Sequence, residues 1–173
     1  MEEFWDRIRR ACMLDPEVYE EVEADPSATF SAALVVVLSA LAAGIGSIFT
    51  AGVFGLIAYS LFALFAWYIW AFSSYYIGTR LLPEYETEAD HGQLLRTMGF
   101  AAAPGLIRVL GVIPGIGGLF YPLAGIWMLI ATVIAVRQAL DYSSTPRAVA
   151  VCTLGWIVYA MVAFLPAYIF RLE

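Results

Sequence analysis

A run of 54 residues without a charged side chain constrains this fold more than any other feature, and it covers residues 26–79. A transmembrane helix needs about 20 apolar residues, because the hydrocarbon core is about 30 Å thick and a helix rises about 1.5 Å per residue. The run therefore predicts a hairpin of two spans, near 28–49 and 53–80, with its turn among the glycines of 44–55. The second span is long enough to tilt or to project beyond the bilayer.

Three shorter apolar stretches predict three more spans, near 93–111, 117–137 and 147–169. With 62% hydrophobic residues and a mean hydropathy of +0.80, the chain is too apolar for a soluble domain. We predict an all-α protein, a polytopic membrane helical bundle of five transmembrane helices with short N-terminal amphipathic helices. Residues 1–27 would form a cytoplasmic N-terminal part, and residues 28–170 would form the membrane domain.

The segment 2–13 has the pattern of a short amphipathic helix. Phe4, Ile8 and Cys12 repeat every four residues, and arginines flank that face. Such a helix can lie in the membrane interface with its arginines on lipid phosphates, or it can pack on the cytoplasmic end of the protein itself. A second helix is expected at 16–24, where an Asp-Pro pair gives a start signal. Its glutamates form either a solvated face or an acidic patch for a partner.

All nine basic residues are arginines, and their distribution predicts the orientation. With five spans, seven arginines fall on one face and two on the other. The seven are Arg7, Arg9, Arg10, Arg80, Arg96, Arg137 and Arg147; the two are Arg108 and Arg171. Arginines in short loops favour the cytoplasmic side. We therefore expect a cytoplasmic N-terminus and an outside C-terminus, in what fits a prokaryotic inner (cytoplasmic) membrane.

Two sets of residues have patterns typical of membrane helices. Small side chains at four-residue spacing let helix backbones approach closely in lipid, and aromatic side chains gather at the membrane interfaces. The predicted helix-packing residues are Ser39, Ala42, Ala43, Gly46 and Ser47. The predicted interfacial anchors are Trp5, Trp67, Trp70, Tyr75 and Tyr76. For the aromatic residues of 67–76, a cluster that stacks on a ligand is the alternative.

The third span carries both a proline and a charge. Pro104 should kink it, because proline lacks the backbone donor that a helix interior needs. Arg108 is the one charge in this apolar stretch, either as a snorkelling anchor or helix cap, or as a functional site. A hinge around Pro114 and Gly115 follows. Candidate contacts for lipid or a partner are Arg96, Arg108, Arg137 and Arg147.

No residue set in the sequence predicts catalysis, a metal or a cofactor. The single histidine, His91, has Glu88 and Asp90 nearby but lacks a further ligand, and no span contains a histidine to ligate haem. Cys12 and Cys152 lack metal-ligand spacing. We therefore expect no enzyme, no metal, no cofactor and no nucleic-acid partner.

Four short motifs together resemble the Yip domain family, named for Ypt/Rab-interacting proteins. They are Arg96-x-x-Gly99-Phe100-Ala101-x-x-Pro104, Ile126-Trp127, Val136-Arg137-Gln138-Ala139 and Thr145-x-Arg147-Ala148. The resemblance implies five spans, a cytoplasmic N-terminus and no known enzymatic centre. Eukaryotic members bind Rab GTPases, but this chain lacks their long hydrophilic N-terminal region, which puts a Rab partner in doubt.

Two functions agree with these features. The first is a non-enzymatic membrane scaffold or accessory subunit that binds membrane lipids, other integral membrane proteins or a larger membrane complex. The alternative is a small transporter or channel built on the proline-broken third span. Against the alternative, no acidic side chain lies in a span to carry protons or cations.

Overall fold

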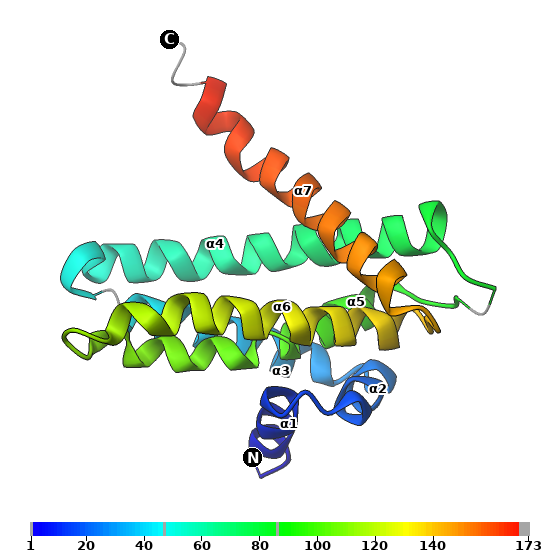
Figure 1. Ribbon diagram of the computed structural model, residues 1–173, viewed down its shortest axis with the longest axis horizontal. Coiled ribbons are helices and arrows are strands. Elements are labelled where there is room, and N and C mark those ends of the chain that lie inside the picture. The colour runs from blue at the N-terminus through cyan, green and yellow to red at the C-terminus, as the bar shows by residue number, and fades with distance from the viewer. Residues whose placement is uncertain (1, 47, 86, 170–173) are drawn as a thin grey trace.

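The computed structural model describes residues 2–46, 48–85 and 87–169. Five segments are long and apolar enough to cross a membrane, which confirms the predicted all-α bundle. In chain order the elements are α1 (Glu2–Cys12), α2 (Pro16–Ala24), α3 (Ala28–Gly46), α4 (Ile48–Tyr76), η1 (Ile77–Leu81), α5 (His91–Phe100), η2 (Ala103–Val112), η3 (Gly117–Leu119), α6 (Phe120–Ala139) and α7 (Thr145–Ile169). Figure 1 shows α4 and α6 along the bundle, with α7 leaving it at an angle.

The N-terminal helices pack on the protein itself, which is the second of the two positions predicted for α1. Ile8 and Ala11 of α1 are buried in the same apolar cluster as Val18 and Val22 of α2. Figure 1 shows both helices against one side of the bundle. The indole Nε1 of Trp127 in α6 donates to a carbonyl of α1, so α1 lies beside the bundle.

Ion pairs join α1 to α2. The Arg7 guanidinium contacts Glu21 at 2.7 Å and Asp25 at 3.1 Å, and Arg10 contacts Asp15 at 2.8 Å and Glu21 at 2.7 Å. These hydrogen bonds from Arg7 and Arg10 lower the pKa of the Glu21 carboxyl. Two of the arginines that could have reached lipid phosphates are therefore paired with carboxylates of the protein itself.

The third span differs from the predicted kinked helix. The α-helix α5 ends at Phe100, and the chain continues from Ala103 as the 3-10 helix η2. Pro104 has no N–H to donate and disfavours α geometry at the residue before it. The backbone changes to i→i+3 bonding there, as in the 3.0 Å bond from Gly105 N to Ala102 O. The proline thus changes the helix type.

Small residues bring α3 and the third span together. A Cβ added at Gly99 would lie 2.7 Å from Cβ of Ala32, and one added at Gly105 would lie 2.0 Å from Oγ of Ser39. A Cβ added at Gly111 would lie 3.0 Å from Cα of Gly46. The contacts follow the same order in both segments, so the segments run parallel, as two odd-numbered spans must. Of the predicted packing residues, Ser47 lies outside the described residues.

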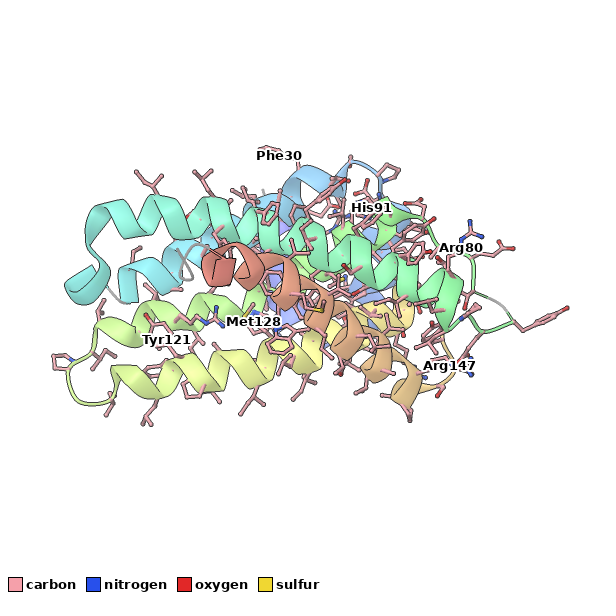
Figure 2. The ribbon with its side chains drawn as sticks, turned by 90° about the horizontal axis from the view of Figure 1, so that it is seen from above. Phe30, Arg80, His91, Tyr121, Met128 and Arg147 are labelled. Carbon is pink, nitrogen blue, oxygen red and sulfur yellow. The ribbon has the colours of Figure 1, made fainter. Side chains whose placement is uncertain are left out.

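The connections at one end of the bundle contact each other. The Tyr142 hydroxyl, after α6, donates to the carbonyl oxygens of Gly78 at 3.0 Å and Leu82 at 2.7 Å. Figure 2 shows Arg80 and Arg147 at this same end. At the other end, Gly115 has φ +85°, a conformation that favours glycine, within the turn between η2 and η3.

Candidate functional site

A cavity of about 610 Å³ lies inside the bundle. Large apolar and aromatic side chains from four helices form much of its wall: Phe62, Trp67, Trp70, Met98, Met128 and Trp156. Figure 2 labels two lining residues, Met128 near the middle of the bundle and Tyr121 closer to the end that carries the 113–118 turn. This cavity is the candidate site.

Two tryptophans of α4 fix the cavity wall to neighbouring helices. Nε1 of Trp67 donates to the Leu95 carbonyl at 3.0 Å, and Nε1 of Trp70 donates to the Cys152 carbonyl at 3.2 Å. Both indole N–H groups are therefore satisfied inside the protein. The sequence predicted these residues as interfacial anchors, and the structure shows them lining the cavity.

The other predicted anchors lie outside the cavity. Trp5 on α1 is 55% exposed and Tyr76 at the end of α4 is 53% exposed. The Tyr75 ring is half-buried and lies 6.1 Å from the ring of His91. Their depth in a bilayer stays a prediction.

Arg108 is the one cation among the described residues that line the cavity. Its Nε atom is buried without a hydrogen-bond partner, and the described lining includes no carboxylate. Tyr121, from α6, donates its hydroxyl to the Ala43 carbonyl at 2.8 Å and lies on the same wall. The guanidinium thus borders an internal cavity, and whether it acts as an anchor or as a functional contact stays a prediction.

Arg96 has internal partners at the C-terminal end of α2. Its Nε donates to the Val22 carbonyl at 2.9 Å, and its Nη2 donates to the Glu23 carbonyl. Carbonyls in the last turn of a helix lack intrahelical donors and carry partial negative charge, so a buried cation satisfies them. Arg96 therefore fixes α2 to α5.

The two remaining candidate arginines lie near the connection after α6. Arg137 donates from Nε to the Tyr142 carbonyl at 3.1 Å. Arg147 donates to the Pro83 carbonyl at 3.2 Å and lies 3.5 Å from a Glu84 carboxylate oxygen. Neither lines the cavity, so the structure does not bring the four candidate arginines together.

The predicted hinge residues have different surroundings. Pro104 is fully buried near the start of η2. Pro114 and Gly115 are exposed in the turn after η2. Within the described residues, only the 113–118 turn has the exposure expected of a hinge in this region.

A second, polar hollow lies between α2, α5 and the end of α6. It is lined in part by Glu20, Glu23, Gln93, Gln138 and Asp141. Gln93 Nε2 donates to Glu23 at 3.0 Å, and Gln138 Nε2 donates to Glu20 at 2.6 Å. Burial, together with the negative charge of Asp141, raises the pKa of the Glu23 carboxyl to about 7.

His91 has aromatic neighbours. Its ring centroid lies 5.1 Å from that of Tyr68 and 5.4 Å from that of Phe72, both edge-on. Across residues 2–46, 48–85 and 87–169 there is no group of three or more His, Cys, Asp or Glu side chains that could hold a metal ion.

The sequence interpretation missed most of the cavity lining. Tyr121, Met128 and Tyr159 line the cavity, but no pattern distinguishes them from other residues that face lipid. One missed local signal was readable: Asp90 and Gln93 form a capping box at the start of α5.

Comparison with known proteins fits this five-span bundle. The family model for the Yip1 domain matches residues 10–165. The chain belongs to the Yip1 domain family. The match begins within α1 and ends within α7, so the Yip1 domain covers both the cavity and the docked helix α2. No curated protein matches the sequence, and no solved structure matches it.

Proposed function

We propose that this Yip1-domain protein is a non-enzymatic integral membrane scaffold or accessory subunit that binds other membrane proteins or lipids. Helix α7 is the observation that carries the proposal. Between residues 154 and 162, every exposed residue of this helix is apolar: Leu154, Trp156, Ile157, Val158, Met161 and Val162. A helix that is apolar all round is stable only inside a protein or a membrane.

The first part of α7 packs on α4. Near Gly155, an added Cβ would lie 2.7 Å from Oγ of Ser74 and 3.1 Å from Trp70. The contact extends to Tyr159, whose ring centroid lies 6.3 Å from that of Phe62. Toward its C-terminal end, Figure 1 shows α7 diverging from the bundle. Membrane helices associate through close packing, so the diverging part offers a surface to a helix of another membrane protein.

Site-specific photo-crosslinking in native membranes tests this proposal. A photoreactive residue at Met161 should give adducts with another membrane protein, which pull-down in mild detergent and mass spectrometry would then identify. The matched control is Leu129, which is 55% exposed on α6, against 65% for Met161. Lipid adducts alone at Met161, together with no co-purifying protein, would contradict the proposed protein-binding role.

The cavity and the break between α5 and η2 favour a small transporter or channel as the second candidate, because broken helices line many transporter sites. Labelling of a single cysteine at Ala40, which lines the cavity, separates the two, with Cys12 and Cys152 replaced. A transporter should expose Ala40→Cys to aqueous reagents from both sides of the membrane in turn. A scaffold should show no such alternation.

The proposed orientation is a cytoplasmic N-terminus and an outside C-terminus. The connections 82–90 and 140–144 contact each other, which supports their location on one side of the membrane. A reporter fused after Glu173 should read as outside, and one inserted in 84–90 should read as cytoplasmic. The same side for both would contradict the five-span topology.

A further inference from the structure

We propose that the internal cavity binds an anionic amphiphile, with a compact phosphate or carboxylate on the Arg108 guanidinium and an apolar chain along the aromatic wall. This inference rests on the proposed binding function and names the class of lipid.

The first step of the argument is the need of Arg108 for an anion. A charged side chain within a membrane span is costly unless it is paired or reaches water. Nε of Arg108 is buried, and it has no partner among the residues described. The described cavity lining supplies no carboxylate. The planar guanidinium fork binds phosphates and carboxylates with two parallel hydrogen bonds, so it matches either group.

The second step is the apolar character of the rest of the wall. The N–H groups of Trp67 and Trp70 and the hydroxyl of Tyr121 already donate to backbone carbonyls. The Thr132 hydroxyl likewise donates to the carbonyl of the residue four positions before it. These groups have no donor left for a polar metabolite. Besides Arg108, the described lining leaves only the hydroxyls of Ser39 and Tyr159 and the N–H of Trp156 for such a ligand. A ligand with one charged group and a hydrocarbon chain fits better than a sugar or a nucleotide.

The third step is access from the membrane. The cavity volume of about 610 Å³ falls in the range of roughly 300–1,000 Å³ typical of small-molecule sites. Trp156 and Phe62 line the cavity, yet they are 52% and 44% exposed. The cavity therefore reaches the protein surface between α7 and α4. Because both helices are apolar there, a lipid chain can enter sideways from the bilayer.

Tryptophan quenching by brominated acyl chains tests the proposal on the full chain. The protein is placed in phosphatidylcholine nanodiscs that contain a small fraction of brominated phosphatidylglycerol, brominated palmitate or, as the neutral control, brominated phosphatidylcholine. Three of the five tryptophans line the cavity. We expect saturable quenching by at least one of the anionic probes at low mole fraction, and only weak, non-saturating quenching by the neutral probe.

Variants connect the quenching to the cavity. Arg108→Gln should raise the mole fraction of anionic probe needed for half-maximal quenching by about tenfold or more, because a hydrogen bond between charged groups is lost. Arg108→Lys should retain part of the binding. Ala66→Phe keeps the arginine but fills the cavity, and it should abolish saturable quenching while the unfolding temperature stays near wild type. Arg80→Gln, which removes an exposed arginine outside the cavity, should bind like wild type.

The outcomes separate the possible ligands and the two proposals. Saturation by phosphatidylglycerol alone identifies a membrane phospholipid headgroup, and saturation by palmitate alone identifies a free fatty acid; either supports the inference. Equal half-saturation for the neutral probe, or unchanged quenching in both Arg108→Gln and Ala66→Phe, overturns it. The crosslinking at Met161 does not depend on the cavity, so a failure of protein binding and a failure of lipid binding are distinguishable.

Discussion

Two arginines of the same span, Arg96 and Arg108, have opposite surroundings. Arg96 is 6% exposed, and its guanidinium donates to two carbonyls at the end of α2. Arg108 is half-buried beside a cavity, and its Nε has no partner in the part of the chain that the structure describes. The two residues are twelve positions apart, and both look alike in the sequence.

The difference shows that the cost of burying a cation depends on what the rest of the chain brings to it. α2 is a separate N-terminal element, and its C-terminal carbonyls satisfy Arg96. The described wall around Arg108 has no carboxylate, and no group there accepts a hydrogen bond from its Nε. Arg96 therefore acts as a structural residue, whereas Arg108 remains available to a ligand.

The largest effect is expected at Arg96. Arg96→Ala leaves two carbonyls of α2 without their donor and should lower the free energy of unfolding by roughly 3–5 kcal/mol. Arg96→Lys should lose less, because one ammonium can still reach one carbonyl. Thermal unfolding in detergent measures both, and Arg80→Ala, an exposed arginine, is the control. Equal stability for Arg96→Ala and Arg80→Ala would show that the α2 contact is unimportant.

Gly46→Leu tests the packing behind Arg108. A Cβ at Gly46 would lie 2.1 Å from the backbone oxygen of Arg108 and 2.7 Å from the Tyr121 hydroxyl. Forcing these backbones apart should lower the free energy of unfolding by about 1–3 kcal/mol. Gly125→Leu is the matched control, because an added Cβ there meets nothing within 4 Å. The melting temperatures of the two variants are compared in one detergent. Indistinguishable values would refute the close packing of α3 on η2.

Glu23 allows a pH test at the α2 end. Its folded pKa of about 7 lies above the ordinary value of 4.5, so folding favours the protonated carboxyl. Burial is the main cause, and Asp141, Glu20 and Asp90 reinforce it while Arg96 opposes it. This contribution to stability is fully present below pH 4.5, falls as the pH rises toward 7, and is constant above.

Glu23→Gln should remove that dependence. The free energy of unfolding of the variant, relative to wild type, should be higher at pH 8 than at pH 5. After allowance for solvent screening, this difference should be roughly 1–2 kcal/mol. Unfolding curves at the two pH values provide the measurement, with Glu17→Gln, on an exposed face of the same helix, as control. A pH dependence equal in wild type and Glu23→Gln would show that the carboxyl is ionised normally in the fold.

The smallest effect, of opposite sign, is expected at Arg108. In lipid-stripped protein in a neutral detergent, Arg108→Gln removes a poorly solvated cation and leaves no internal partner behind. The free energy of unfolding should stay the same or rise by up to about 1 kcal/mol. A loss as large as that of Arg96→Ala would mean that Arg108 has a strong internal partner, and the contrast between the two arginines would disappear.

The sequence by itself determined the five spans and the start of α2. It also showed that the second span is long, although α4 begins at Ile48 and the prediction began near residue 53. The charge-free runs show the spans, because the hydrocarbon core excludes charges over a fixed thickness. Asp15 caps α2 through a side-chain oxygen that accepts a hydrogen bond from Glu17 N at 3.0 Å. Small residues such as Ser39 and Gly46 also marked α3 as a packing helix. All of these are local properties, readable within a few turns of chain.

Only the tertiary structure decided which arginine is satisfied and where a cavity forms. Arg96 and its acceptor Val22 are 74 positions apart, and Tyr121 and Ala43 are 78 positions apart. Apolar residues that face lipid and those that line a cavity have the same composition. The sequence therefore could not show that Trp67 and Trp70 line a cavity. The partner of a buried polar group depends on which distant segment packs beside it, and no local pattern records that.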